Sequence, residues 1–217
     1  MRTRRTGAAL AAVAVLAVGL AGCSSSSDNA SGQPVAVITA SQKPGTVLDT
    51  PFEKPDLILT DTHGKKYDLL KETKGSPTLI YFGYTHCPDV CPTTMSDIAI
   101  AKSKLSASQQ AALKVVFITT DPARDSPARL GEWLAAMDKT FIGLTGDFTT
   151  IQAGARSIGV DVEKPVKEKD GSITSTHGAQ VIAYSPKDDK AHVLYMSGTT
   201  SDQFLADLPK IIKGETP

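Results

Sequence analysis

Apolar and polar positions along the chain follow two periods, which predict alternating strands and helices. Seven short segments have the continuous or alternating apolar pattern of strands, and they are Leu57–Thr60, Tyr67–Leu70, Thr78–Phe82, Val115–Thr119, Phe141–Leu144, Val181–Tyr184 and Val193–Met196. Helical spacing recurs over four segments, which are Met95–Leu105, Leu130–Met137, Ile151–Ile158 and Phe204–Ile212. Ser126 and Thr200 stand before two of these helices and are their predicted N-caps.

The order of these segments predicts an α/β fold. Thr78–Phe82 and Val115–Thr119 are apolar without alternation, which is typical of strands buried on both faces. Strands that alternate with helices imply right-handed parallel crossovers, whereas the hairpin after Val181 adds antiparallel strands. We therefore expect a thioredoxin-like arrangement, in which a mixed central sheet has helices on both faces and an extra β-hairpin at the N-terminal side.

The first residues have the pattern of an export signal. Three arginines lie within the first five positions and precede the apolar run Ala8–Leu20, which is short for a membrane-spanning helix of roughly 20 residues. The run ends in Leu20-Ala21-Gly22-Cys23, which resembles the lipobox of bacterial lipoproteins and implies cleavage before Cys23 and its lipidation. An ordinary cleaved signal with an incidental cysteine is the alternative. The adjacent pair Arg4-Arg5 leaves the export route open between Sec and twin-arginine.

These patterns divide the chain into three segments. We expect a lipoprotein signal peptide at 1–22, a lipidated flexible tether at 23–50 and one folded domain at 51–217. The tether is rich in Ser, Asn, Gly, Gln and Pro. Two acyl chains would hold such a protein on a membrane surface. The expected location is the outer face of a bacterial cytoplasmic membrane, with Cys23 as the anchor.

Charge and composition exclude several classes of protein. The 217 residues carry 23 basic and 23 acidic side chains, and 41% hydrophobic residues are enough for a core. Without residues 1–22 the balance is 20 basic to 23 acidic, so the mature chain is mildly acidic. A nucleic-acid binder would need a basic stripe, so no nucleic acid is expected as a partner. Three cysteines are too few for a disulfide-stapled scaffold.

The candidate chemistry lies in Cys87 and Cys91, which follow a predicted buried strand and begin a helix. Four residues apart, the two sulfurs can lie on one face of that helix, whose N-terminus favours thiolate. A structural disulfide would close a tiny loop and contribute little. A redox-active dithiol and a soft-metal site both fit the C-x-x-x-C spacing, and spacing alone does not decide between them.

A metal site needs a third ligand, and histidine is the usual partner of thiolates. His63 lies in a predicted hairpin turn and His192 opens a strand, and both are expected to face solvent. His86 is next to Cys87, so its side chain is expected to point away from the sulfur and to act, at most, beside the metal. His177 lies in a polar loop before a buried strand and is the other candidate ligand. Spacing does not choose firmly between His86 and His177.

Two longer motifs carry a family resemblance. Phe82–Thr94 resembles the signature of the Sco/SenC copper chaperones, and Thr119–Pro127 is similar to that family's T-x-D-P-x-R-D-T-P segment. The resemblance covers the domain from Pro51 and implies a thioredoxin-like fold that binds one copper, as Cu(I) or Cu(II), per chain. The implied ligands are Cys87, Cys91 and His177. The implied recipient is subunit II of cytochrome c oxidase, whose binuclear copper centre the family serves.

Four further residues in or near these motifs have roles that the spacing of the thiols does not address. Thr176 stands where the family usually has Asp, which leaves the orientation of the ligand imidazole open. Asp121 ends the second buried strand and is expected beside the metal, where a carboxylate would tune ligand protonation. Arg124 and Asp125 are interpreted instead as parts of a turn and a helix cap.

Two functions remain open at this stage. The first is a copper chaperone, supplied by another extracytoplasmic copper chaperone and kept reduced by an external thiol reductant. The second is a thiol–disulfide reductase, with Cys87 and Cys91 as the catalytic pair, that keeps oxidase cysteines reduced for metal insertion. Whether the protein is an enzyme is therefore undecided, although the chaperone is favoured.

Overall fold

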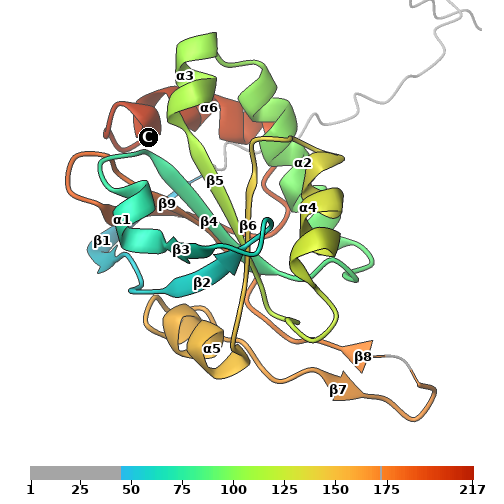
Figure 1. Ribbon diagram of the computed structural model, residues 1–217. Helices are drawn as coiled ribbons and strands as arrows, with labels where there is room; N and C mark the ends of the chain where they lie inside the picture. Colours follow the sequence, from blue (N-terminus) through green and yellow to red (C-terminus); the bar gives the residue numbers. More distant parts are fainter. Residues whose placement is uncertain (1–44, 172) are drawn as a thin grey trace, which may run out of the picture. The chain divides into compact units, whose positions relative to one another are not determined.

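The computed structural model describes residues 45–171 and 173–217, which are built on one mixed β-sheet (Figure 1). The eight strands of the sheet are β1 (Thr46–Glu53), β2 (Ile58–Asp61), β3 (Lys66–Asp68), β4 (Thr78–Gly83), β5 (Lys114–Thr119), β6 (Ile142–Thr145), β9 (Val181–Tyr184) and β10 (Lys190–Tyr195). Their spatial order is β1-β10-β9-β4-β5-β6-β2-β3. The predicted export signal, Cys23 and most of the predicted tether lie outside the described residues.

The centre of the sheet is formed by the continuous apolar runs. β4 pairs parallel with β5, and β5 pairs parallel with β6, whereas β9 pairs antiparallel with β4. All six residues of β4 are buried, as expected for a strand with helices on both sides. The alternation of side chains sends Leu79 and Tyr81 into one core and Ile80 and Phe82 into the other.

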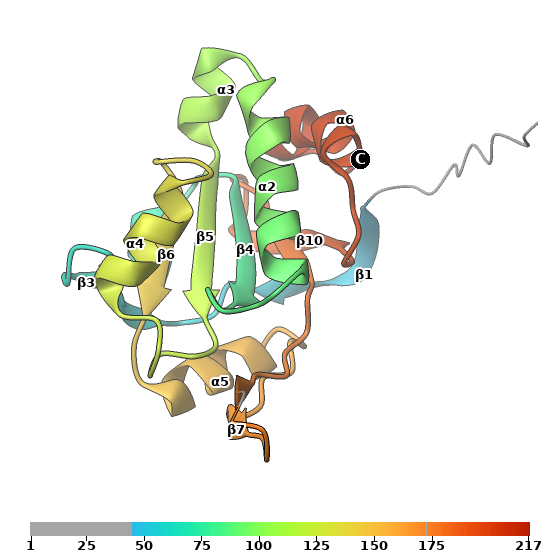
Figure 2. The ribbon, with the colours of Figure 1, turned by 90° about the vertical axis from the view of Figure 1, so that its right-hand side faces the viewer.

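Helices cover both faces of this sheet (Figure 2). One core is closed by α2 (Val90–Ser103), α4 (Pro127–Ala135) and α6 (Ser201–Ile212), and the other by α5 (Phe148–Arg156), with α1 (Leu69–Thr73) contributing Leu69. A short helix, α3 (Ala107–Ala112), connects α2 to β5. The predicted caps are confirmed, because Ser126 accepts from the backbone N–H of Arg129 and Thr200 forms a capping box with Gln203.

The extra N-terminal hairpin is confirmed as β2 and β3, but its second strand is shorter than predicted. Leu69 and Leu70 belong to α1, because the side chain of Asp68 accepts a hydrogen bond from the backbone N–H of Lys71 and caps a helix there. The apolar pair Leu69-Leu70 fits either element, so local pattern alone did not separate them.

Regular structure also begins earlier than the predicted domain boundary at Pro51. β1 starts at Thr46 and pairs antiparallel with β10 at the edge of the sheet. Its residues show little apolar alternation, and its hydrogen-bond partner lies far along the chain. The strand is therefore set by a non-local pairing that the local sequence does not reveal. Among the described residues, no helix has the length and apolarity needed to cross a membrane.

Candidate metal centre

Cys87 and Cys91 lie at the carboxyl end of β4, where the chain turns into α2. Figure 2 shows β4 and β5 pointing toward this edge, at which α2 begins. Gly83 ends β4 and leaves room for the site, because a Cβ built there would lie 3.0 Å from Cys91 Sγ and 2.7 Å from a ring carbon of Tyr81. The absence of a side chain at Gly83 thus lets Cys91 pack directly against the strand end.

The two cysteines are free thiols with different exposure. Cys91 is fully buried, whereas Cys87 is partly exposed. Asp89, the N-cap of α2, makes no side-chain capping bond, and the backbone N–H of Cys91 instead donates to Cys87 Sγ at 3.3 Å. A free N–H of the first helical turn therefore holds the Cys87 sulfur beside Cys91.

The burial of Cys91 sets its protonation. Burial raises the pKa of the Cys91 thiol to about 12, because an apolar environment disfavours the thiolate. The hydroxyl of Tyr81 donates to Cys91 Sγ at 3.5 Å and opposes this effect only in part. The raised pKa of Cys91 thus runs against the expectation of a thiolate at this position of the helix.

His177 lies in contact with Cys91. The distance from His177 Nε2 to Cys91 Sγ is 3.7 Å, although the residues are 86 positions apart in the chain. His177 Nδ1 is 3.0 Å from the carbonyl oxygen of Gly178, which can only accept, so Nδ1 carries the proton and Nε2 keeps its lone pair. Burial lowers the pKa of His177, so the ring is neutral and able to act as a ligand.

The loop that carries His177 is fixed to the body of the domain by backbone hydrogen bonds. The N–H of Glu163 donates to the carbonyl of Thr176 at 2.9 Å, and the N–H of Gly178 donates to that of Asp161 at 2.8 Å. His177 itself forms an isolated β-bridge with Val162. The imidazole is thus oriented by its own backbone and by Gly178, which settles the question raised by Thr176 without a carboxylate at that position.

Aromatic rings enclose the imidazole. The ring of Tyr84 is 5.7 Å from that of His177 and nearly perpendicular to it, and the ring of Tyr81 is 6.2 Å away with a similar angle. Tyr84 also contacts Arg124, whose guanidinium carbon lies 5.9 Å from the centre of the Tyr84 ring. These rings exclude water from one side of His177 and keep the imidazole in place.

The structure changes the roles of the two aspartates near the site. Asp121 is buried and pairs with the Nε of Arg124. It is therefore linked to His177 through Arg124 and Tyr84 and not by a direct contact with a proposed ligand. Asp125 is fully buried and accepts from Thr85 N at 2.9 Å, from Thr85 Oγ1 at 2.6 Å and from Thr119 Oγ1 at 2.6 Å.

The interpretation of Asp125 as part of a turn is confirmed, because its backbone N–H donates to the carbonyl of Asp121 at 3.0 Å. The structure adds a role for its side chain. Its carboxylate ties the end of β5 to Thr85, two residues before Cys87. The sequence signal was available, because two threonines that precede a buried turn are suitable donors to one carboxylate. The pairing of Thr85 with Asp125 is non-local, so only the parallel register of β4 and β5 brings them together.

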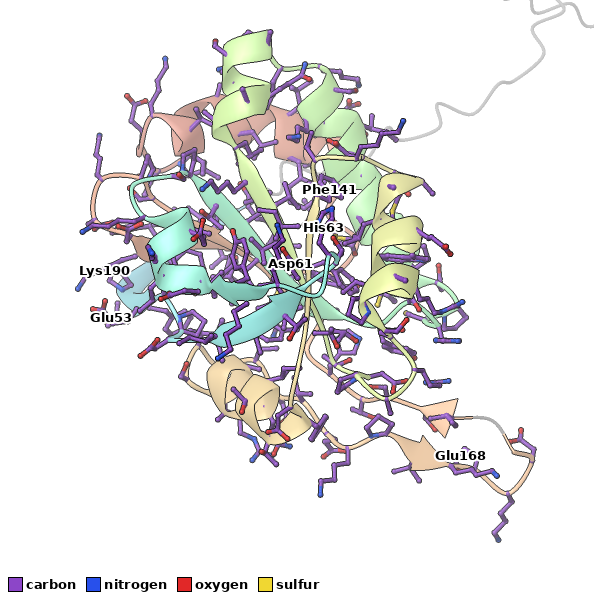
Figure 3. The ribbon with its side chains drawn as sticks, in the orientation of Figure 1. Glu53, Asp61, His63, Phe141, Glu168 and Lys190 are labelled. Carbon is purple, nitrogen blue, oxygen red and sulfur yellow. The ribbon has the colours of Figure 1, made fainter. Side chains whose placement is uncertain are left out.

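The remaining histidines lie apart from the thiols. His86 Nδ1 is 3.3 Å from Thr85 Oγ1 and 3.5 Å from Asp125 Oδ1, so its side chain points toward the carboxylate, as expected for a residue beside the site. His63 lies on the β2–β3 turn near Asp61 with its side chain 80% exposed (Figure 3). His192 pairs with Asp188 at 2.8 Å. His177 is thus the histidine in contact with a cysteine.

Two thiols and one neutral imidazole form a donor set suited to a soft metal. Across residues 45–171 and 173–217, no three His, Cys, Asp or Glu side chains are already grouped as a metal site. Cys91 and His177 are in contact, and Cys87 is held next to Cys91 by the helix N–H. The chemistry of these three residues therefore fits a Cys₂His centre.

These features define a class: a thioredoxin-like protein with a thiol pair at the β4–α2 turn and an imidazole brought to it from a distant loop. The family model SCO1/SenC matches residues 42–213, so the chain belongs to the SCO1/SenC family. A putative copper-binding protein of Stutzerimonas stutzeri is 34% identical over 142 residues, covering 64% of this chain and 69% of that protein. The mitochondrial protein SCO1 of Saccharomyces cerevisiae is 35% identical over 124 residues, 55% of this chain but only 42% of the yeast protein.

Solved structures share the fold. Bradyrhizobium japonicum ScoI with copper bound matches with a TM-score of 0.63 at 34% identity, covering 75% of this chain and 98% of that one. Arabidopsis thaliana ScoI with copper bound matches with a TM-score of 0.65 at 29% identity, covering 76% and 97%. BsSco, a member of the Sco family of cytochrome c oxidase assembly proteins, has the same fold at 20% identity, with a TM-score of 0.60 over 76% and 97%.

Proposed function

We propose that this protein is a membrane-anchored copper chaperone that holds one copper ion through Cys87, Cys91 and His177. The observation that carries the proposal is the 3.7 Å contact between Cys91 Sγ and His177 Nε2 beside a second thiol. Copper-bound structures of two relatives support the choice of metal. Thiolates suit Cu(I) and imidazole also suits Cu(II), so this donor set can hold either state.

The exposure of the ligands suggests how copper would enter. Cys87 is partly exposed and Cys91 is buried, so Cys87 meets the ion first. Binding at Cys91 requires the loss of its proton, because the thiol is the dominant form at neutral pH. His177 already presents an unprotonated Nε2 toward Cys91, so it needs no change of protonation.

The recipient in this proposal is subunit II of cytochrome c oxidase, at its binuclear copper centre. Membership of a family whose member BsSco is an oxidase assembly protein supports this destination. The proposed segments are a lipoprotein signal peptide at 1–22, a tether at 23–50 lipidated at Cys23 and a copper-binding domain at 51–217. The first described strand, β1, starts at Thr46, within the proposed tether. Another copper chaperone would supply the ion and an external thiol reductant would keep Cys87 and Cys91 reduced.

A second candidate function is thiol–disulfide reduction, which the free thiols and their unequal exposure favour. The thiolate of Cys87 would attack a disulfide of the target and release one target thiolate. Cys91 would then lose its proton, attack the Cys87 sulfur of the mixed disulfide and release the second target thiolate. Two electrons pass to the target, the released thiolates take up protons, and Cys87 and Cys91 are left as a disulfide that the external thiol reductant must reduce.

His177→Ala separates the two functions. We expect the variant to lose the thiolate-to-Cu(II) charge-transfer absorption and to bind copper at least about tenfold more weakly. The loss of a direct metal ligand should lower the affinity more than the loss of a residue that only supports a ligand. Reduction of a model disulfide should continue at a similar rate. The measurement is a copper titration of the reduced chain with absorption spectra, paired with a thiol-release assay.

The control for His177→Ala is His192→Ala, since His192 pairs with Asp188 away from the thiols. That variant should bind copper as the unchanged chain does. If His177→Ala retains full copper affinity and the same spectrum, the proposed ligand set is wrong. If it loses copper but still supports oxidase activity in cells, thiol reduction is the main function.

Copper binding should strengthen as pH rises. The raised pKa of Cys91, about 12, means that the thiol is protonated throughout the neutral range and that each copper bound at Cys91 releases its proton. The lowered pKa of His177 adds no proton release above neutral pH. The apparent association constant, measured between pH 6.5 and 8.5 by competition with a chelator, should therefore rise at least about tenfold per pH unit. An affinity that is constant over this range would exclude Cys91 as a ligand.

A further inference from the structure

A cavity of about 370 Å³ opens at the same edge of the sheet as the thiols, but outside the Cys₂His centre. Its walls come from the turn after β5, from the start of α5 and from the segment that includes β7 (Val166–Lys167) and β8 (Ile173–Thr174). Pro122, Phe148, Pro165 and Ile173 make most of its surface apolar. An apolar cavity with a few polar groups is the usual form of a binding site.

The charged residues of this cavity are mostly cationic. Arg124, Lys164 and Lys167 line it, and Asp121 is the carboxylate among its lining residues. Asp121 is buried and pairs with Arg124, so it does not offset the two lysines. Both lysines are exposed and can move toward a ligand. The lining therefore complements an acidic ligand that also has apolar groups.

Arg124 retains hydrogen-bonding capacity. Its Nε binds Asp121, but its buried Nη2 has no hydrogen-bond partner within the described part of the chain. A buried guanidinium N–H without an acceptor is costly, and a carboxylate is the acceptor that matches it best. A carboxylate that enters the cavity meets the exposed Lys164 and Lys167, and it reaches the buried Nη2 only if the Arg124 side chain moves.

The same arginine connects the cavity with the metal centre. Arg124 packs on Tyr84, and Tyr84 packs edge-on against His177, with a centre-to-centre distance of 5.7 Å between the two rings. A ligand in the cavity therefore lies two side chains from a proposed copper ligand. A partner protein bound in the cavity would thus be held near the metal centre while copper passes from one protein to the other.

The β7–β8 hairpin extends this surface. Lys167 pairs with Ile173 across the hairpin, and Val166 beside them is 57% exposed. Figure 3 shows the hairpin, marked by Glu168, projecting beyond α5 at the carboxyl edge of the sheet. Val166 and Ile173 therefore add exposed apolar side chains beside the cavity.

We propose that this cavity, lined by Arg124, Phe148, Lys164, Lys167 and Ile173, docks an acidic and apolar segment of the protein that receives the copper. The inference rests on the proposed function for the identity of the partner. Apolar side chains of the segment fill the space between Phe148 and Ile173. Its carboxylates face Lys164, Lys167 and the guanidinium of Arg124.

The test uses two fluorescein-labelled peptides and the full chain. The first peptide is acetyl-Asp-Leu-Asp-Phe-Asp-amide, and the second replaces each Asp by Asn. Fluorescence anisotropy at low salt should give saturable binding of the acidic peptide and at least tenfold weaker binding of its amide counterpart. Added salt should weaken binding of the acidic peptide, because the lysines are exposed to solvent.

The variant that tests the cavity is Lys164→Glu with Lys167→Glu, which should weaken binding of the acidic peptide at least tenfold. Ile173→Ala should weaken it about fivefold through lost apolar contact. The matched control is Lys65→Glu with Lys139→Glu, which changes the net charge equally and leaves the cavity intact, since Lys139 lies at the opposite edge before β6. The control should change binding less than twofold.

Three results would overturn the docking site: no saturable binding of the acidic peptide, equal binding of both peptides, or an equal loss in the control. Copper titration of the Lys164→Glu, Lys167→Glu chain keeps the two proposals distinct, because its copper affinity should be unchanged. If the unsubstituted chain binds the peptide but not copper, the proposed function fails while the docking site stands.

Discussion

Replacing either Cys87 or Cys91 by serine will abolish stoichiometric copper binding by the reduced chain. Each substitution removes a soft sulfur donor and leaves a hydroxyl that binds copper poorly. Loss of a direct ligand should exceed the 10- to 100-fold cost of losing an outer-shell partner, so we expect the affinity to fall by more than about a hundredfold. Equilibrium dialysis with metal analysis should give about one copper per unchanged chain and close to none per variant.

Cys23→Ser is the matched control, because it removes the only other cysteine and lies outside the predicted domain. It should bind copper as the unchanged chain does. Full retention of copper by the double variant Cys87→Ser, Cys91→Ser would reject this site. Loss in one single variant alone would reduce the ligand set to one sulfur and His177.

Replacing Asp125 by alanine will destabilise the fold by about 2–4 kcal/mol, the cost of leaving more than one buried donor without an acceptor. Asp125 is fully buried and accepts from the backbone and hydroxyl of Thr85 and from the hydroxyl of Thr119. Urea unfolding should show a lower midpoint with an unchanged slope. Because Thr85 precedes the cysteine turn, the variant should also bind copper more weakly when folded.

Asp202→Ala is the control for this experiment. Asp202 pairs with Lys104 at 3.1 Å, but both side chains are largely exposed, and such pairs contribute little. Its unfolding free energy should change by no more than about 0.5 kcal/mol. If Asp125→Ala changes the unfolding free energy equally little, the carboxylate does not hold the β4–α2 turn to β5.

Much of the fold follows from local pattern. The two buried strands are recognisable because their apolar runs lack alternation, and the helices beginning after Ser126 and Thr200 because each has a polar N-cap. Pairings at the edge were not predictable in the same way. β1 begins at Thr46 within a polar segment, because β10 supplies its hydrogen bonds from the far end of the domain.

The candidate site divides along the same line. Cys87 and Cys91 are close in sequence, so one turn and one helix bring them together, and their spacing alone identifies a thiol pair. The spacing left His86 and His177 open as ligands. In the structure His86 turns toward Asp125 and His177 reaches Cys91, because backbone hydrogen bonds of the 161–178 region carry it to the sheet edge.

The sequence by itself determined the thiol pair, the alternation of strands and helices and, through two motifs, the family. These features depend on neighbours within about one turn or one strand, so the local sequence is enough to predict them. The tertiary structure decided which histidine meets the thiols, that burial raises the pKa of Cys91, and that Asp125 rather than Asp121 holds the cysteine turn. Each depends on desolvation or on contacts between distant segments, which exist only once the sheet has formed.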